Sequence, residues 1–182
     1  FDRAYVLDQE DAQTIVCRGE TYRQMGKYDE ALVDFDRAIE LDGGDSWALT
    51  CRGLVHLHME RYQDALSDFG RAIDLNPKNA RAVASRGLTF RFMGRFEDAL
   101  ADFGRAIQLE PDRVGPRAER GRTYKMVGRY EEALADLDRA VELSPINSWA
   151  IARRGEICME MERYEEALAD FDWALALKAD DL

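Results

Sequence analysis

The sequence repeats itself with a period of 34 residues, and this period constrains the fold more than any other feature. An arginine–glycine pair recurs five times at this spacing, at Arg18-Gly19, Arg52-Gly53, Arg86-Gly87, Arg120-Gly121 and Arg154-Gly155. An aromatic residue follows each glycine by nine positions, at Tyr28, Tyr62, Phe96, Tyr130 and Tyr164. Self-similarity at a period of roughly 20–50 residues is typical of folds in which one small unit stacks on the next. We therefore expect five such units.

Each unit carries two apolar stripes at helical spacing. We number each repeat from 1, with the units starting at Ala12, Ser46, Ala80, Val114 and Ser148. Positions 4, 8 and 11 then form the first stripe, and positions 17, 20, 21, 24, 27 and 28 form the second. The stripes predict two antiparallel helices of roughly 13 residues each. Position 8 is glycine and position 20 is alanine in every unit, which indicates that the helices cross closely there.

Turn and capping residues delimit these helices. Gly26, Gly94 and Gly128 stand between the two stripes, where a helix end favours a left-handed residue. The second helix is stopped by Pro77, Pro111 and Pro145, and the next first helix is capped by Asp11, Asp45, Asn79 and Asn147. The fourth unit is entered through Gly115-Pro116, and Arg113 replaces its cap residue, so we expect the least regular helix start there.

Two charges recur within every unit, an arginine at position 7 and an aspartate at position 23. Both flank the apolar stripes of their helices. We predict that they pair across helices, for example Arg52 with Asp34 or Asp68. The alternative is two independently solvated charges, in which case neither would affect stability.

The pattern resembles the tetratricopeptide repeat (TPR) family over nearly the whole chain. The family signature of small, aromatic, small, aromatic, alanine, aromatic, alanine and proline residues maps onto Gly87, Phe90, Gly94, Phe96, Ala99, Phe103, Ala106 and Pro111. Four positions depart from it: Glu60 and Glu162 replace the turn glycine, Gly43 replaces the proline, and Arg117 stands where an apolar residue is expected. One helix pair cannot bury its own apolar face, so neighbouring pairs must stack. We expect an all-α protein, an α-solenoid of antiparallel helix pairs, which the resemblance implies is a right-handed superhelix.

The expected organisation is one continuous solenoid domain. Repeats are predicted over residues 12–45, 46–79, 80–113, 114–147 and 148–181. Residues 1–11 align, at an offset of 34, with the second helix of the first repeat, so we expect them to be the second half of such a helix from a preceding repeat. On this view the chain is a piece of a longer array, and a catalytic domain of its parent could lie outside it.

Signals of chemistry are weak. The sequence contains no glycine-rich phosphate loop, nucleophile elbow or Cys-x-x-Cys motif. His56 and His58 are two residues apart, so on a helix they point to different faces and cannot form a metal pair. Cys17 and Cys51 occupy equivalent positions of neighbouring units, about 10 Å apart and too far for a disulfide. We interpret them as small residues lining a groove, and we expect no enzyme activity, metal or cofactor.

The charge balance narrows the class of partner. The chain has 36 acidic and 25 basic residues, a net charge of −11. A strongly acidic surface repels nucleic acid and anionic lipid, and no apolar run approaches the roughly 20 residues that cross a bilayer. We therefore expect a cytoplasmic protein with neither nucleic acid nor membrane as its partner.

The family resemblance implies a concave groove lined from positions 2, 5, 6, 9, 12 and 13 of the first helices. These 30 positions carry six basic and four acidic residues, so the groove is predicted to be +2 while the chain is −11. The candidate site residues are Trp47, Leu54, His58, Arg81, Leu88, Arg91, Phe92, Arg122, Lys125, Met126 and Trp149. For Trp47 and Trp149, packing on the preceding loop is an equally open alternative. Such a surface favours a peptide with acidic and hydrophobic side chains.

Three functions remain open from the sequence. The first, which we favour, is a non-catalytic module that binds a protein or peptide partner in its groove. The second is a regulatory or substrate-presenting arm of a larger enzyme or signalling ATPase. The third is a scaffold that self-associates through its terminal repeats, since uncapped hairpins can stack between chains.

Overall fold

The computed structural model describes residues 11–179, which form ten helices and no strand. The five first helices are α2 (Ala12–Gln24), α4 (Ser46–His58), α6 (Ala80–Phe92), α8 (Val114–Met126) and α10 (Ser148–Glu160). The five second helices are α3 (Tyr28–Leu41), α5 (Tyr62–Leu75), α7 (Phe96–Leu109), α9 (Tyr130–Leu143) and α11 (Tyr164–Ala179). Every first helix begins at position 1 of its repeat, as the 34-residue period predicts. The expected helix in residues 1–11 falls almost wholly outside the described part of the chain.

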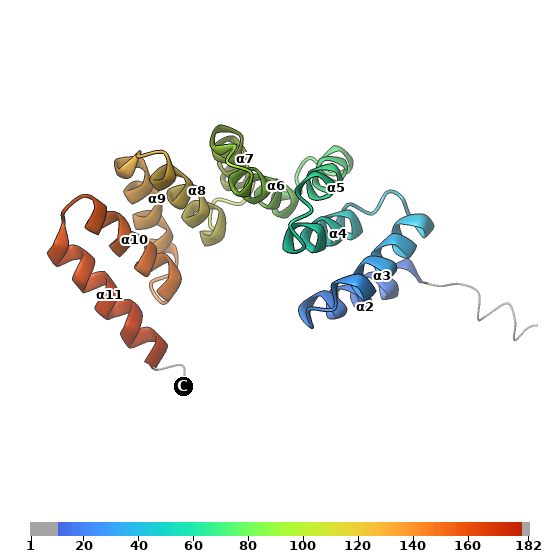
Figure 1. Cartoon of the computed structure of the whole chain (residues 1–182), viewed down its shortest axis with the longest axis horizontal. Helices are drawn as coiled ribbons and strands as arrows, with labels where there is room; N and C mark the ends of the chain where they lie inside the picture. The colour runs from blue at the N-terminus through green and yellow to red at the C-terminus, as the bar shows by residue number, and fades with distance from the viewer. Residues whose placement is uncertain (1–10, 180–182) are drawn as a thin grey trace, which may run out of the picture. The chain divides into compact units, whose positions relative to one another are not determined.

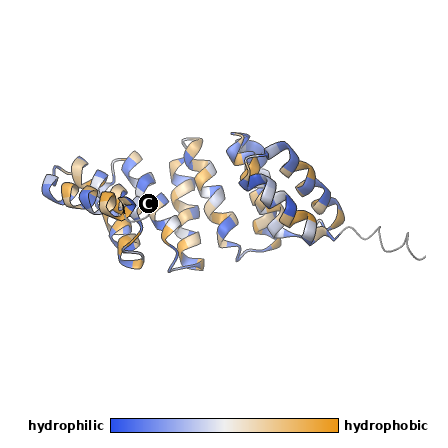
Figure 2. Ribbon diagram, turned by 90° about the horizontal axis from the view of Figure 1, so that it is seen from below, coloured by the Kyte–Doolittle hydropathy of each residue, from blue (hydrophilic) through white to orange (hydrophobic). Residues whose placement is uncertain are grey.

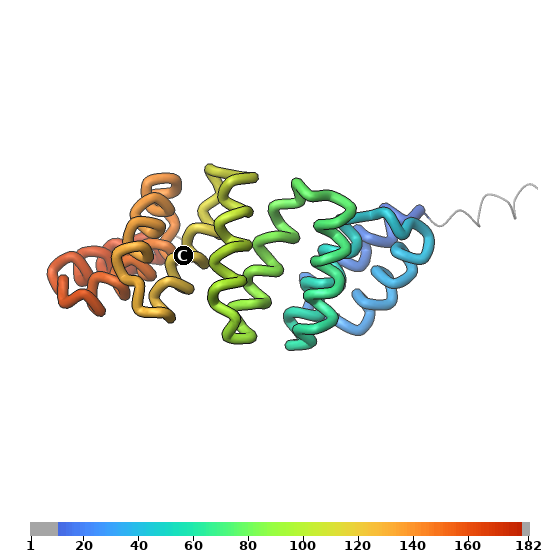
Figure 3. Tube along the Cα trace, turned by 90° about the horizontal axis from the view of Figure 1, so that it is seen from above, coloured from blue at the N-terminus to red at the C-terminus, as the bar shows by residue number. Residues whose placement is uncertain are grey.

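Three residues join the first helix of each pair to the second, and tight antiparallel hairpins form from α2 and α3, α4 and α5, α8 and α9, and α10 and α11 (Figure 3). The middle residue of this turn has a positive φ in all five repeats. Gly26, Gly94 and Gly128 have φ values of 72°, 73° and 75°, and Glu60 and Glu162 have values of 59° and 60°. The backbone amides close the turn, for example from Gly26 to the Arg23 carbonyl at 3.0 Å. The predicted turn glycines are confirmed, and the two glutamates adopt the same backbone conformation without a glycine.

The predicted caps also form. Asp11 accepts hydrogen bonds from the amides of Gln13 and Thr14, and Asp45 accepts one from Trp47. Asn79 and Asn147 accept from the third helical residue of α6 and α10, at 2.9 and 3.0 Å. These bonds satisfy amides that have no partner within the helix.

The expectation of an irregular start to α8 was wrong, although its missing cap is confirmed. Arg113 makes no side-chain capping bond, yet α8 begins at Val114 in register with the other first helices. The third helical residue here is Pro116. Proline has no amide hydrogen, so the donor that Asn79 and Asn147 satisfy elsewhere is absent from this helix.

In four hairpins a phenylalanine ring or a leucine of the second helix packs against the position-8 glycine, at Gly19, Gly53, Gly121 and Gly155. A Cβ atom built on Gly53 would lie 2.7 Å from the ring of Phe69, and one on Gly121 would lie 3.0 Å from Leu137. The position-20 alanines of the second helices are all buried. Helices with such small residues approach closely, and hydrophobic and hydrophilic residues alternate along each of them (Figure 2).

The described residues fall into two compact units, one up to Thr89 and one from Phe90 onward. In the first unit α2 packs on α3 and α4, and α4 packs on α5; in the second, each helix from α7 to α11 packs on the next along the chain (Figure 1). Each unit has its own core, with Phe35 and Val55 buried in the first and Leu137 and Ile151 in the second. This packing of helix pairs on neighbouring pairs is an all-α solenoid architecture.

The predicted arginine–aspartate pairs are confirmed within single hairpins. Arg52 donates from Nε to Asp68 at 2.8 Å, and Arg18, Arg120 and Arg154 make the same two-bond contact with the position-23 aspartate of their own repeat. Asp68 raises the pKa of Arg52 through this bond. Of the two partners expected for Arg52, the structure selects Asp68. The sequence did not indicate a further bond from Arg52 to Asp36 of the preceding repeat, at 2.7 Å.

Candidate functional site

The first helices of each unit present exposed aromatic side chains beside guanidinium groups. In the first unit Trp47 is the second residue of α4, and 39% of its surface is exposed. The guanidinium of Arg81, at the start of α6, lies 4.7 Å from the centre of the Trp47 ring. The two residues are one repeat apart, both at position 2. A cation over an indole face is a favourable contact, and it holds the ring in place at the surface.

The other candidates of the first unit lie elsewhere along α4 and α6. Leu54 and Leu88 are half-buried, so each leaves part of an apolar side chain open to solvent. His58 is exposed and stacks on Tyr28, with the ring centres 5.7 Å apart. Burial lowers the pKa of His58, and Arg23 lowers it further, so its imidazole is neutral near pH 7.

In the second unit Arg91 and Phe92 are neighbours at the end of α6. Arg91 lies 4.5 Å from the centre of the Phe92 ring, which is 51% exposed. Arg91 itself is only 5% exposed and lies 3.3 Å from a carboxylate oxygen of Glu119. Desolvation lowers the pKa of Arg91, and Glu119 opposes this effect. The Arg91 Nε atom is buried with no hydrogen-bond partner in the described structure.

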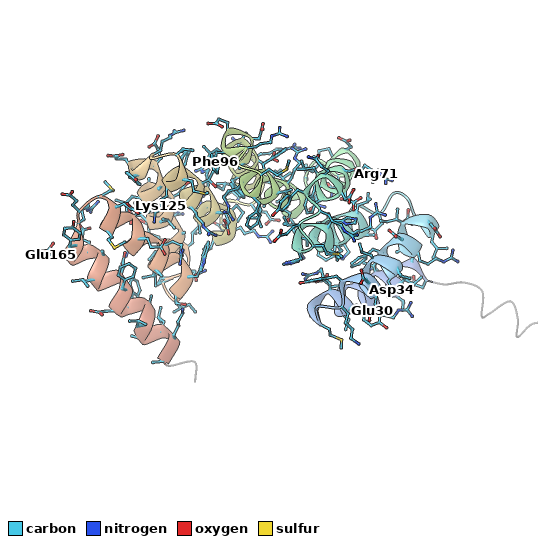
Figure 4. All side chains as sticks on the ribbon, in the orientation of Figure 1. Glu30, Asp34, Arg71, Phe96, Lys125 and Glu165 are labelled. Atoms are coloured by element: carbon cyan, nitrogen blue, oxygen red, sulfur yellow. The ribbon has the colours of Figure 1, made fainter. Side chains whose placement is uncertain are left out.

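Farther along α8, two cations differ in their surroundings. Lys125, which Figure 4 labels, extends toward α10 and lies 3.6 Å from Glu156 and 3.3 Å from Glu160. Arg122 is half-buried and forms no ion pair within residues 11–179. The neighbouring Met126 is 51% exposed. Of these two cations, Arg122 is therefore the one that a carboxylate can approach without displacing another.

Trp149 is the second residue of α10, as Trp47 is of α4. It is 37% exposed, and the guanidinium of Arg153 lies 5.9 Å from its ring centre. Arg153 also pairs with Glu156 at 2.8 Å. Both tryptophans thus retain a substantial exposed area, while a guanidinium lies over each ring.

Several groove positions inferred from the family are buried instead. Cys51 is fully buried in the core of the first unit, so the interpretation of it as a groove-lining residue was wrong. Burial raises its pKa to about 12, which leaves the thiol protonated. Val16, Thr50 and Ala118, all at position 5, are also buried. These side chains fill the contact between neighbouring first helices, as their small size allows.

Sequence reasoning counted the acidic residues of this surface but missed their pairing. Glu20 binds Arg23 through two bonds of 2.7 Å, and Glu156 binds both Arg153 and Lys125. This pairing could have been predicted from the sequence, because residues three apart on a helix are neighbours, as in Glu20–Arg23 and Arg153–Glu156. The stacking of Arg81 on Trp47 could have been found from their shared repeat position.

The described residues offer little for other chemistry. No group of three or more His, Cys, Asp or Glu side chains between residues 11 and 179 is placed to hold a metal ion. Cys17, Cys51 and Cys158 are free thiols. None of the described helices combines the length and the apolar character that crossing a membrane requires.

Arg117 departs from the apolar pattern at the base of α8, and the structure shows how it is accommodated. Its Nη2 donates to the carbonyl of Pro111 at 2.8 Å, while its buried Nε has no partner in the described part of the chain. The side chain thus binds the loop before its own helix.

The helix pairs, the glycine crossings and the positive-φ turns define a helical repeat protein. Family models described as tetratricopeptide repeat match residues 12–45, 46–79, 93–152 and 126–181. The chain belongs to the tetratricopeptide repeat family. The sequence resemblance and the predicted fold class are confirmed.

Solved structures of similar fold cover most of the chain. MamA from Desulfovibrio magneticus RS-1 aligns with a TM-score of 0.80 at 18% identity, over 94% of this chain and 97% of that one. PilF of Pseudomonas aeruginosa aligns with a TM-score of 0.85 at 18% identity, over 91% and 75%. YrrB, described as a TPR protein with an unusual peptide-binding site, aligns with a TM-score of 0.70 at 24% identity, over 98% and 92%. At these identities the likeness shows the fold alone. No curated protein sequence matches this chain significantly.

Proposed function

We propose that the chain is a non-catalytic interaction module whose first-helix surfaces bind a partner segment with acidic and hydrophobic side chains. The observation that carries this proposal is the set of exposed rings with a guanidinium over each: Trp47 with Arg81, Phe92 with Arg91, and Trp149 with Arg153. Tryptophan and arginine are the side chains most enriched at the centres of protein interfaces. The family, whose members bind protein or peptide partners, is consistent with this function, and YrrB is described as having a peptide-binding site.

The charge distribution supports an acidic partner. The chain as a whole carries −11, so a partner with carboxylates is repelled by most of the surface. On the first helices, Arg81 and Arg122 have no ion pair within the described residues, whereas Arg23, Lys125 and Arg153 are already paired. A carboxylate binding at Arg81 or Arg122 therefore gains an ion pair without breaking one.

The burial of Arg91 gives it a different role from Arg122. Because its side chain is almost fully covered and lies beside Glu119, its role is to hold the Phe92 ring in place. A charge reversal at Arg91 would place two carboxylates together in a buried position, and this would disturb folding. Arg122 is therefore the residue at which a charge reversal tests binding.

The test is a selection of random peptides displayed against the folded chain, followed by binding measurements on the selected peptides. We expect enrichment of sequences that combine acidic with aromatic or aliphatic residues. Arg81→Glu, Arg122→Glu, or the pair should weaken binding at least tenfold, because an attraction becomes a repulsion. Arg71→Glu makes the same charge change on an exposed position of the second helix α5 (Figure 4) and should leave binding within twofold. Selection of basic peptides, or equal loss with the control variant, would refute the proposal.

A further inference from the structure

The last repeat has a pocket on the side of its second helix. In the other repeats the corresponding position of the first helix carries an aromatic or imidazole ring. The pocket has a volume of about 280 Å³ and lies between α9 and α11 over α10. Eight residues line it: Leu134, Asp138, Arg154, Cys158, Arg163, Glu166, Ala169 and Asp170. None of them belongs to the candidate surface described above.

The repeat explains why the space is there. Position 11 of the first helix is Tyr22, His56, Phe90 or Tyr124 in the first four units and Cys158 in the fifth. Every earlier unit thus has a ring at this position, and the last has a side chain too short to replace it. Cys158 is only 2% exposed, so it forms the floor of the pocket.

The groups that contact the ring elsewhere are still present around the pocket. In the fourth unit the guanidinium groups of Arg129 and Arg120 lie 4.5 and 5.9 Å from the centre of the Tyr124 ring. Their counterparts in the fifth unit, at positions 16 and 7, are Arg163 and Arg154, and both line the pocket. Arg163 is held by Glu166 and Arg154 by Asp170 and Asp138. The cations that would face a ring are therefore fixed in place before any ring arrives.

Size and polarity indicate which ring would fit. A cavity of about 150 Å³ is enough for benzene, so 280 Å³ accommodates a phenol ring and its first carbon atom. Five of the eight lining residues are charged, and the carboxylates of Asp138 and Glu166 can accept a bond from a hydroxyl group. A phenol therefore suits the lining better than a purely apolar ring.

We propose that this pocket binds a tyrosine side chain of a partner protein, which takes the place that Tyr124 fills in the preceding repeat. The site lies on the second helices and does not depend on the function proposed for the first-helix surfaces. Cys158 has no chemical part in it, because burial raises the pKa of its thiol and keeps it protonated. Its contribution is its small size.

The direct test is a titration of the chain with N-acetyl-tyrosinamide, in which binding is monitored through the NMR signals of Leu134, Cys158 and Ala169. We expect saturable shifts with a Kd on the order of millimolar, as for a single ring. N-acetyl-phenylalaninamide should bind several-fold more weakly and N-acetyl-leucinamide should not bind. Free p-cresol distinguishes a small phenol from a tyrosine side chain as the ligand. If p-cresol binds and the tyrosinamide does not, the ligand is not a tyrosine of a protein.

Two variants fix the location. Cys158→Tyr supplies the missing ring from within, so it should abolish these shifts and raise the melting temperature. Cys158→Ser keeps the pocket open and should bind the tyrosinamide as the original chain does. Should Cys158→Tyr fail to fold, Ala169→Leu narrows the pocket from an exposed position of α11 and should weaken binding at least fivefold. No saturable shift in the original chain, or shifts that persist in the blocked variants, would overturn the proposal.

Discussion

At the scale of single residues, the turn inside each hairpin is the position where the backbone decides which side chain is tolerated. Three turns use glycine, and two place Glu60 and Glu162 at φ values near +60°. An L-residue in this conformation has its Cβ close to the following carbonyl oxygen, at a cost of about 1–2 kcal/mol. The two glutamates therefore carry strain that the packing of their hairpins offsets.

This strain predicts the effect of restoring the glycine. Glu60→Gly should stabilise the first unit by roughly 0.5–1 kcal/mol, since relief of strain exceeds the added flexibility of the unfolded chain. Glu162→Gly should act alike in the second unit. Chemical unfolding measures both. Glu60→Ala is the control, because it removes the carboxylate but keeps the Cβ, and a gain equal to that of glycine would contradict the account.

The half-buried His56 makes stability depend on pH. Desolvation lowers its pKa, which Asp68 and Asp64 raise and Arg52 and Arg61 lower. In the unfolded chain the imidazole takes up a proton near pH 6.5, whereas folded His56 takes one up only at lower pH. The contribution of neutral His56 to the free energy of unfolding is therefore fully present above pH 6.5 and is lost as the pH falls toward the folded pKa.

His56→Phe puts at this position the residue found at Phe90 in the third repeat. This substitution should reduce the loss of unfolding free energy between pH 7 and pH 5.5. The pH dependence that remains should come from His58, whose pKa is also lowered. Unfolding free energies at several pH values measure this slope. An unchanged slope would show that His56 does not titrate differently in the two states.

At the scale of helices, the arginines Arg18, Arg52, Arg120 and Arg154 each join the two helices of their hairpin, and Arg52 and Arg154 also bind the preceding hairpin. Arg52 reaches Asp36, and Arg154 reaches Asp138 at 3.2 Å, both at position 25 of the preceding second helix. In the third repeat position 25 is Gly104, so Arg120 lacks this second carboxylate. A Cβ atom on Gly104 would lie 3.6 Å from Arg120 Nη1.

The bond within the hairpin should matter for stability. Asp68→Asn keeps the shape of the buried side chain and removes the charge that Arg52 binds. We expect a loss of about 1–3 kcal/mol, typical of a hydrogen bond to a charged group. Asp36→Asn breaks the exposed bond of the same arginine and should cost under about 1 kcal/mol. Equal losses in thermal unfolding would mean that burial does not set the strength of these pairs.

The bond between hairpins can be added where it is missing. Gly104→Asp should stabilise the second unit by about 0.5–1.5 kcal/mol, from helix propensity and a new pair with Arg120. Gly104→Asn has a similar shape and no charge, and it should give only the propensity gain. The difference between them should shrink in high salt, and a difference that salt leaves unchanged would exclude an ion pair.

At the scale of the whole chain, the 34-residue period allowed the helices, the turns, the caps and the family to be predicted, because each depends on residues close in sequence. The partner chosen by Arg52, the burial of Cys51 and the pairing of the surface charges depend on how neighbouring helices meet, and the period alone does not fix these. The regular start of α8 was missed because the missing amide of Pro116 was not weighed against the missing cap.

The tryptophans allow the proposed binding surface to be located in one measurement. Trp47 and Trp149 lie at the starts of the first helices α4 and α10, while Trp173 lies on the second helix α11 with a similar exposed fraction, 38%. We would titrate an acidic, hydrophobic peptide from the selection into the chain and follow the three indole N–H signals by NMR. The account predicts that the Trp47 or the Trp149 signal shifts in a saturable manner while that of Trp173 stays in place. A shift confined to Trp173, or none at all on binding, would contradict it.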